Sequence, residues 1–258
     1  MSFRVRVWMA AVASLIYWTI GATGFFLLAL LLSPLLPADR SRGIGQNLLH
    51  QAFAGYVALL RLFGIVRCEF IGFEQLEREP VGIIIAPNHP AIWDAVFIIG
   101  RLPGLTCILK SSLLRNPFLA GGVRLARFIP NDPPHEMVKR CVHSLQNGER
   151  LLLFPEGTRT RKSEGVVNEF RGGIALVARH SKAPVWPVFV RTDGDYGSKG
   201  RPLWHVPERP ITITMTVGQP MTCGEQESAH DFLDRLRQPY IAALSAPPDE
   251  DRRSHPQL

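Results

Sequence analysis

Residues 88–94 (NHPAIWD) hold a histidine and a carboxylate at a spacing that suits acid–base chemistry, His89 preceding Asp94 by five positions. Histidine exchanges a proton near neutral pH more readily than other side chains. A carboxylate that folds back to one ring nitrogen fixes the tautomer and stabilises the imidazolium. The pair predicts a general base with its orienting partner. A histidine that only caps a helix start is the alternative interpretation of the same short spacing.

Residues 154–159 (FPEGTR) form a second candidate segment, suited to binding an anion. Gly157 allows a tight backbone turn, and the planar guanidinium of Arg159 matches a phosphate or carboxylate in a bidentate manner. Arg161, Lys162 and Arg171 follow nearby and make the neighbourhood basic. The segment predicts an anion-binding turn, and a solvated run of charges in a loop is the alternative.

Both segments follow apolar stretches typical of strands, and helix-like segments alternate with such strands. Short, apolar segments rich in β-branched residues predict strands at Val66–Ile71, Gly82–Ala86, Leu105–Leu109, Leu151–Phe154, Val185–Val190 and Ile211–Val217. Helices are predicted at Ile92–Arg101, Pro134–Gln146, Glu169–Ser181 and Ser228–Leu244, the last interrupted near Pro239. This alternation indicates an α/β fold with a largely parallel mixed sheet flanked by helices.

The N-terminal region predicts a membrane anchor. Val7–Leu32 contains no charged residue and as a helix would extend roughly 39 Å, more than the ~30 Å hydrocarbon core of a bilayer. An apolar run of this length favours an uncleaved anchor over a signal peptide. Apolar residues at helical spacing in Ile44–Val66 predict a second helix, which either packs on the domain or joins the first as a hairpin at the membrane interface. We expect anchoring helices in 1–65, a catalytic domain in 66–245 and a disordered tail in 246–258.

Composition narrows the class of protein further. The 258 residues are 46% hydrophobic, which excludes wholesale disorder. The net charge of +7 suits an anionic partner, for which an anionic membrane surface, a nucleic acid and a phosphorylated substrate all qualify. No nucleic-acid-binding motif is present, so we expect no nucleic acid partner. Four scattered cysteines without a C-x-x-C pair argue against a disulfide framework or a cysteine zinc site and indicate reduced thiols.

Taken together and in this order, the two segments resemble the glycerolipid acyltransferase family that includes the 1-acylglycerol-3-phosphate acyltransferases. Three further segments agree with the pattern of that family: residues 110–114 (KSSLL), 170–173 (FRGG) and 183–188 (APVWPV). The resemblance spans residues 88–190 and implies transfer of a fatty acyl group from an acyl-CoA or acyl-carrier-protein thioester to a lipid hydroxyl. No cofactor and no metal would be required.

The resemblance also implies roles for individual residues. His89 would be the general base and Asp94 its orienting partner, so that the acceptor hydroxyl attacks the thioester without an acyl-enzyme intermediate. Residues implied in substrate binding are Asn88, Lys110, Glu156, Gly157, Thr158, Arg159 and Arg171, with Arg159 on the acceptor phosphate. The acceptor implied first is the lysophospholipid 1-acylglycerol-3-phosphate, and the product is phosphatidic acid.

One departure from the family pattern leaves the acceptor open. Asn131 stands where the family usually has an arginine, and asparagine carries no charge. A lyso-ornithine lipid, a specialised glycolipid or a polyene lipid is therefore an alternative acceptor. A thioesterase-like hydrolase and a non-catalytic lipid-binding protein are further alternatives. We expect the protein in the inner (cytoplasmic) membrane, with its catalytic domain facing the cytoplasm.

Overall fold

A computed structural model describes residues 2–32, 35, 37–79, 82–161, 163, 165–200 and 207–247. The chain divides into two compact units. The first comprises Met1–Arg67, Ala95–Met137 and Val206–Ile211, and the second comprises Cys68–Asp94, Val138–His205 and Thr212–Leu258. The domain boundaries expected from the sequence stay predictions. The tail beyond residue 247 lies outside the described residues.

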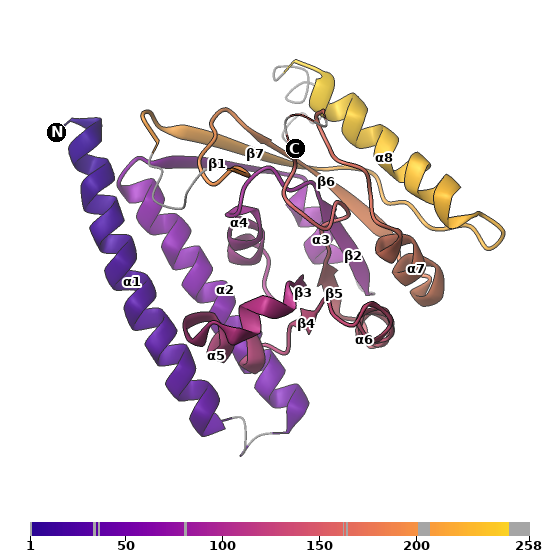
Figure 1. The fold of residues 1–258 in the computed structure, drawn as a ribbon, viewed down its shortest axis with the longest axis horizontal. Coiled ribbons are helices and arrows are strands. Elements are labelled where there is room, and N and C mark those ends of the chain that lie inside the picture. Colours follow the sequence, from indigo (N-terminus) through magenta and orange to yellow (C-terminus); the bar gives the residue numbers. More distant parts are fainter. Residues whose placement is uncertain are drawn as a thin grey trace. The chain divides into compact units, whose positions relative to one another are not determined.

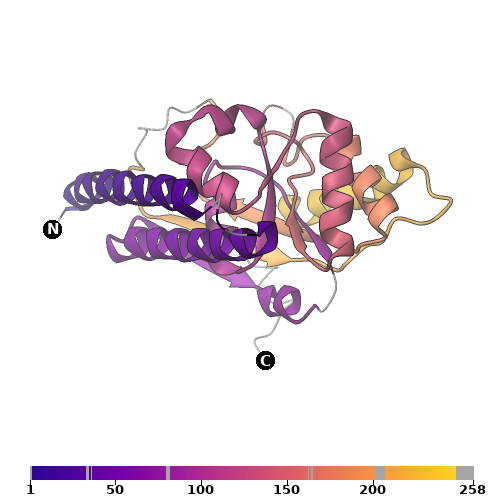
Figure 2. The ribbon, with the colours of Figure 1, turned by 90° about the horizontal axis from the view of Figure 1, so that it is seen from below.

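Helices α1 (Phe3–Leu32) and α2 (Ala38–Leu62) belong to the first unit and lie side by side in Figures 1 and 2. The hydroxyl of Tyr17 on α1 donates to the carbonyl oxygen of Ala52 on α2 at 2.7 Å. The ring of Trp18 packs on those of Phe53 and Tyr56, with centroids 5.6 and 5.0 Å apart. By length and composition α1 is apolar enough to cross a membrane. The two predicted N-terminal helices are present, but the second spans Ala38–Leu62 rather than Ile44–Val66, since Val66 already belongs to the strand Val66–Ile71.

The first unit also contains Ala95–Met137. Its elements are α4 (Asp94–Arg101), β3 (Leu105–Leu109), the 3₁₀ helix η1 (Ser111–Arg115), α5 (Pro117–Leu125) and β4 (Ile129–Pro130). Strands β3 and β4 pair in parallel. Elements η1, α5 and β4 were not predicted from the sequence. The fit of α5 against α1 depends on tertiary contact, since a Cβ at Gly121 would lie 2.7 Å from the Cα of Phe26.

In the second unit the strands follow the order β1 (Val66–Ile71), β7 (Ile211–Val217), β6 (Val185–Thr192), β2 (Ile83–Pro87) and β5 (Arg150–Leu152). Strand β2 pairs in parallel with both β5 and β6, whereas β6 and β7 are antiparallel. The predicted α/β class with a largely parallel mixed sheet is confirmed. Because β2, β5 and β6 run in one direction, the segments that leave their carboxyl ends emerge at one edge of the sheet.

Helices α3 (Phe73–Arg78), α6 (Pro134–Gln146), α7 (Gly172–Ser181) and α8 (Ala229–Ser245) complete the structure. Figure 1 shows α8 running beside α7 and along β6. The predicted interruption near Pro239 is wrong, because α8 continues through this proline. Phe232, Leu236 and Tyr240 lie four residues apart and are fully buried, so one continuous face of the helix is held in the core.

Two predicted helices begin later than expected. The helix predicted from Ile92 begins at Asp94, because Ile92 N–H donates to the carbonyl of Gly197 at 3.0 Å and its backbone serves another segment. The helix predicted from Glu169 begins at Gly172, because the preceding Arg171 is extended.

The ends of some strands also differ from the prediction by one or two residues. The strand predicted to reach Phe154 ends at Leu152, although Leu153 N–H still donates to Ile85 at 3.0 Å. Helix α3 was not predicted, since its six residues are too few to show a periodic pattern.

Candidate active site

The segment that follows β2 carries the histidine and the carboxylate in direct contact. His89 Nδ1 lies 2.9 Å from Asp94 Oδ2, and the backbone N–H of Ala91 donates to the same oxygen at 2.8 Å. The half-buried imidazole stacks on the ring of Phe154, with centroids 4.1 Å apart. With Nδ1 donating to the carboxylate, the basic lone pair is at Nε2. The predicted pairing of His89 with Asp94 is present in the structure.

The side chain of Asp94 is only 1% exposed, and this burial is the largest influence on the pKa of its carboxyl. Burial raises the pKa of the Asp94 carboxyl above its usual value, while the hydrogen bonds from His89 and Ala91 and the charge of Arg159 act in the opposite direction. Asp94 Oδ1 has no hydrogen-bond partner within the described part of the chain. A buried carboxylate needs a hydrogen-bond donor beside it, and the ring nitrogen of His89 occupies that position.

Asn88 uses its side chain to extend the sheet. Its Nδ2 donates to the carbonyl oxygen of Val190 at 2.9 Å, and its Oδ1 accepts from the N–H of Val190 at 2.7 Å. The amide thus imitates a backbone partner for β6 just beyond the end of β2. In the structure this amide fixes the backbone immediately before His89, and the substrate-binding role predicted for Asn88 stays a prediction.

Glu156 joins the two motif segments through a buried carboxylate that is 1% exposed. Its Oε1 accepts from the N–H of His89 and from the hydroxyl of Thr160, both at 2.8 Å. Its Oε2 accepts from the N–H of Asn168 at 2.9 Å. In addition, the N–H of Thr160 donates to the carbonyl oxygen of His89 at 2.7 Å. These contacts hold the backbone of the histidine against the FPEGTR turn.

Arg159 is positioned both by the backbone of the FPEGTR turn and by the hydrogen bonds of its own guanidinium. Gly157 has a φ of 64°, which a side chain would strain, and a Cβ there would lie 3.1 Å from Arg171 Cγ. The half-buried Arg159 donates from Nη1 to the carbonyl oxygens of Gly197 and Ser198, at 2.9 and 3.2 Å. The arginine is therefore pinned at one nitrogen by a third segment.

This third segment, residues 193–200 (DGDYGSKG), was not predicted to belong to the site. Tyr196 stacks on Trp93 of residues 88–94, the histidine turn, with ring centroids 5.6 Å apart. Gly197 has a φ of 76°, and its lack of a side chain leaves room for the Trp93 ring. Lys199 Nζ donates to Thr158 Oγ1 at 2.9 Å. The segment follows β6 at the same edge of the sheet as the other two turns. Its position after a parallel strand was the sequence signal that could have identified it.

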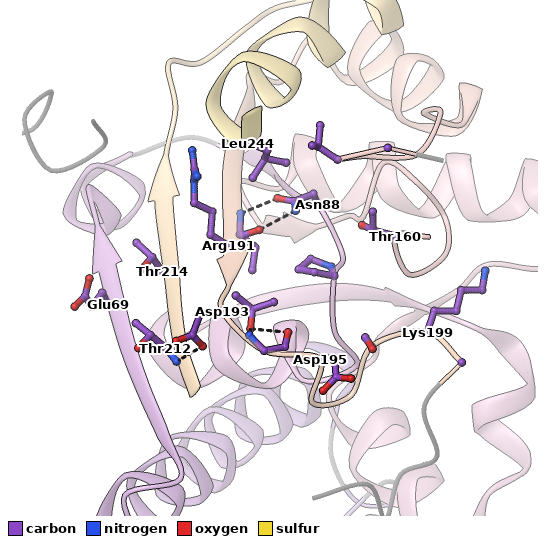
Figure 3. A pocket seen from close by; sticks show the side chains of 18 of the residues that line it. Glu69, Asn88, Thr160, Arg191, Asp193, Asp195, Lys199, Thr212, Thr214 and Leu244 are labelled. Atoms are coloured by element: carbon purple, nitrogen blue, oxygen red, sulfur yellow. Dashed lines mark hydrogen bonds between the residues drawn. The ribbon is translucent and has the colours of Figure 1, made fainter. Parts of the chain in front are cut away.

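A cavity of about 1200 Å³ adjoins the histidine turn in the second unit. Asn88 and Pro90, the chain neighbours of His89, line it together with Thr160 and Lys199. Figure 3 shows Glu69 of β1 at the end of the cavity opposite to Lys199. The cavity is therefore mixed in charge, and Lys199 provides a cation at the end near the motif segments.

The acyltransferase family model matches residues 67–191, which contain both motif segments. This match covers just under half of the 258 residues. The family resemblance inferred from the motifs is confirmed, and the protein is an acyltransferase.

Two relatives of this acyltransferase and one solved structure illustrate the match. The 1-acyl-sn-glycerol-3-phosphate acyltransferase of Pseudomonas aeruginosa is 29% identical over 256 residues, which cover 94% of each chain. The enzyme of the same name from Saccharomyces cerevisiae is 33% identical over 128 residues, covering 46% of this chain and 41% of its own. The crystal structure of the 1-acyl-sn-glycerophosphate acyltransferase PlsC from Thermotoga maritima aligns with a TM-score of 0.68 at 18% identity, covering 93% of this chain and 97% of that one. This structure shows the same fold.

The other two residues predicted to bind substrate, Arg171 and Lys110, do not take part in the hydrogen bonds described above. Arg171 is exposed, and its Cγ lies beside Gly157 of the FPEGTR turn. Lys110 belongs to the first unit, where it follows β3 and is exposed. Asn131 is in that unit too, and its Oδ1 accepts from the N–H of Ser111 at 3.0 Å. The structure thus gathers His89, Asp94, Asn88, Glu156, Gly157, Thr158 and Arg159 around two adjoining turns of the second unit.

Proposed function

We propose that this acyltransferase moves a fatty acyl group from an acyl-CoA or acyl-carrier-protein thioester to the hydroxyl of 1-acylglycerol-3-phosphate, giving phosphatidic acid. The observation that carries the proposal is the 2.9 Å contact between His89 Nδ1 and Asp94 Oδ2, in a turn that Glu156 fastens to the segment of Arg159. The names of the relatives from Pseudomonas aeruginosa and Saccharomyces cerevisiae support the choice of acceptor.

His89 acts as the general base in the proposed reaction. Nε2 takes the proton of the acceptor hydroxyl as its oxygen attacks the thioester carbonyl carbon. The new C–O bond forms, the C–S bond breaks, and the departing thiolate receives the proton from the imidazolium. Asp94 keeps Nδ1 protonated throughout and stabilises the imidazolium. No acyl-enzyme forms, and no metal or cofactor takes part.

Arg159 binds the phosphate of the acceptor. Its Nη1 is held by the carbonyl oxygens of Gly197 and Ser198, and its Nε and Nη2 have no hydrogen-bond partner among the described residues. A guanidinium fixed at one nitrogen presents its other N–H groups in a defined direction, which suits bidentate binding of a phosphate.

Helix α1 brings the enzyme to the lipid. Its apolar side chains are largely exposed, and the chain carries a net charge of +7, which favours an anionic membrane surface. We place the protein at the inner (cytoplasmic) membrane with the catalytic unit facing the cytoplasm. In this position the enzyme meets a soluble acyl donor and a membrane-bound acceptor.

The test uses the full chain purified in detergent, with palmitoyl-CoA or palmitoyl-acyl-carrier protein as donor. The acceptors are lysophosphatidic acid, lyso-ornithine lipid and monoacylglycerol, and mass spectrometry identifies the products. We expect phosphatidic acid as the main product. His89→Ala should lower turnover by about 10²–10⁴-fold, the usual contribution of general base catalysis, with an unchanged melting temperature.

Two results would contradict the proposal. Free fatty acid as the main product would identify a thioesterase-like hydrolase. Acylation of lyso-ornithine lipid without acylation of lysophosphatidic acid would retain the chemistry but assign another acceptor.

A further inference from the structure

We infer that Lys199 is the second cation that binds the acceptor phosphate, beside Arg159. This inference rests on the proposed function, and it assigns a binding role to a segment that carries none of the family motifs.

The charge of the acceptor calls for more than one cation. A phosphate monoester carries about 1.5–2 negative charges at neutral pH, and Arg159 supplies a single positive charge. Asn131 is uncharged and donates no compensating charge, and its Oδ1 already accepts from the N–H of Ser111. A second positive charge must therefore come from another residue.

Lys199 and Arg159 are held by each other's segments. Lys199 Nζ donates to the hydroxyl of Thr158, the residue before Arg159. In turn, Arg159 Nη1 donates to the carbonyl oxygens of Gly197 and Ser198, the two residues before Lys199. This reciprocal arrangement brings the two cationic side chains to the same turn and fixes one terminal nitrogen of each.

The ammonium of Lys199 retains capacity for a ligand. It has three N–H groups, and its hydrogen bond to Thr158 uses one of them. Lys199 makes no ion pair with a carboxylate of the described residues. A hydroxyl orients the ammonium without neutralising it, so the full positive charge is available to an anion.

The cavity beside the histidine turn locates the phosphate at one end. Lys199 lines this cavity with Asn88, Thr160 and Asp195, whereas Glu69, Arg191 and Asp193 line it farther along (Figure 3). Arg191 also lines the cavity, but its guanidinium donates to the carbonyl oxygens of Ala243 and Ala246. Lys199 is the lining cation that lies beside the FPEGTR turn, through its bond to Thr158. The acceptor phosphate accordingly lies against the FPEGTR turn.

The experiment measures KM and kcat for Lys199→Met with lysophosphatidic acid and, separately, with the uncharged monoacylglycerol. We expect KM for lysophosphatidic acid to rise about tenfold or more, the loss typical of one charge-assisted hydrogen bond, with kcat changed by less than about threefold. The values for monoacylglycerol should not change. Lys199→Arg should restore most of the affinity for lysophosphatidic acid, because it restores the charge.

Lys182→Met is the matched control, since Lys182 is 81% exposed and pairs with Glu225. It removes the same charge and should leave both KM values unchanged. An unchanged KM for lysophosphatidic acid in Lys199→Met would overturn the inference while the proposed function stands. An equal loss with both acceptors would also overturn it, by showing a structural role. Failure of the proposed function is distinguishable, because the unmodified enzyme would then form no phosphatidic acid.

Discussion

In soluble proteins apolar side chains are usually buried and charged side chains are usually exposed. Helix α1 exposes apolar side chains, whereas the two motif turns (residues 88–94 and 154–159) bury acidic ones. On α1, Leu15 is 70% exposed and Ile20 is 68% exposed, although both are apolar. In the turns after β2 and β5, Asp94 and Glu156 are each 1% exposed, although both are acidic. Soluble domains rarely expose contiguous apolar surface of this kind or bury carboxylates without partners.

The difference shows how each region is stabilised. Glu156 can be buried because it accepts hydrogen bonds from His89, Thr160 and Asn168, which replace its contacts with water. The exposed side of α1 has no such internal compensation and requires an apolar environment outside the protein. The turns therefore depend on internal contacts, and we expect α1 to depend on lipid, as the proposed membrane location implies. Substitutions should affect the two regions in different assays.

The largest effect is expected for Glu156→Ala. This change leaves three buried or half-buried donors without an acceptor, and we expect a loss of about 3–4 kcal/mol in the free energy of unfolding. Because the N–H of His89 is one of these donors, turnover should fall as well. Thermal unfolding in detergent and the phosphatidic acid assay measure the two effects.

Glu169→Ala is the control for this prediction, since Glu169 is exposed and lies next to Asn168 in the chain. It should change neither stability nor turnover. A Glu156→Ala variant as stable and active as the unmodified enzyme would show that the buried carboxylate does not hold the histidine turn.

The second prediction concerns α1. Leu15→Asp places a charge near the middle of this helix, where insertion into a bilayer costs about 2.5–3.5 kcal/mol, or on the order of a hundredfold in partitioning. We expect weaker flotation with phospholipid vesicles and unchanged turnover in detergent. Gln51→Asp on the exposed side of α2 is the matched control. Vesicle binding equal in both variants would contradict contact of α1 with the hydrocarbon core.

The smallest effect is a pH dependence at the start of α8, outside both regions. Arg235 donates to both carboxylate oxygens of Glu227 at 2.7 Å and lowers the pKa of Glu227 from its ordinary value of 4.5 to about 2. The stabilisation is present above pH 4.5 and is lost as the pH falls towards 2. Since Arg235 is 44% exposed, we expect less than about 1 kcal/mol.

Melting temperatures of the unmodified enzyme and Glu227→Gln between pH 6 and 3 test this prediction. The difference between the two proteins should shrink as the pH falls, whereas Glu169→Gln should show no such trend. A constant difference would exclude the ion pair as its cause.

Much of the site was predictable because its signals are local. The spacing of His89 and Asp94 placed both in one turn after a strand, and the apolar run of α1 and the alternation of strands and helices indicated the anchor and the α/β class. The errors are the unpredicted elements η1, α3, α5 and β4, the interruption expected near Pro239, and the ends of several elements. Asp94 rather than Ile92 begins α4 because backbone groups of another segment bind the intervening turn.

The sequence by itself determined which residues can do the chemistry, since residue types and short spacings survive in any fold. Tertiary structure decided which of them face one another. Asn88 bonds to Val190 across 102 positions, and Arg159 bonds to Gly197 across 38. Such contacts depend on the order of strands β5, β2 and β6, which no local pattern encodes. The buried position of Glu156 and the place of Lys199 beside Thr158 follow from that order, because parallel strands deliver distant segments to one edge of the sheet.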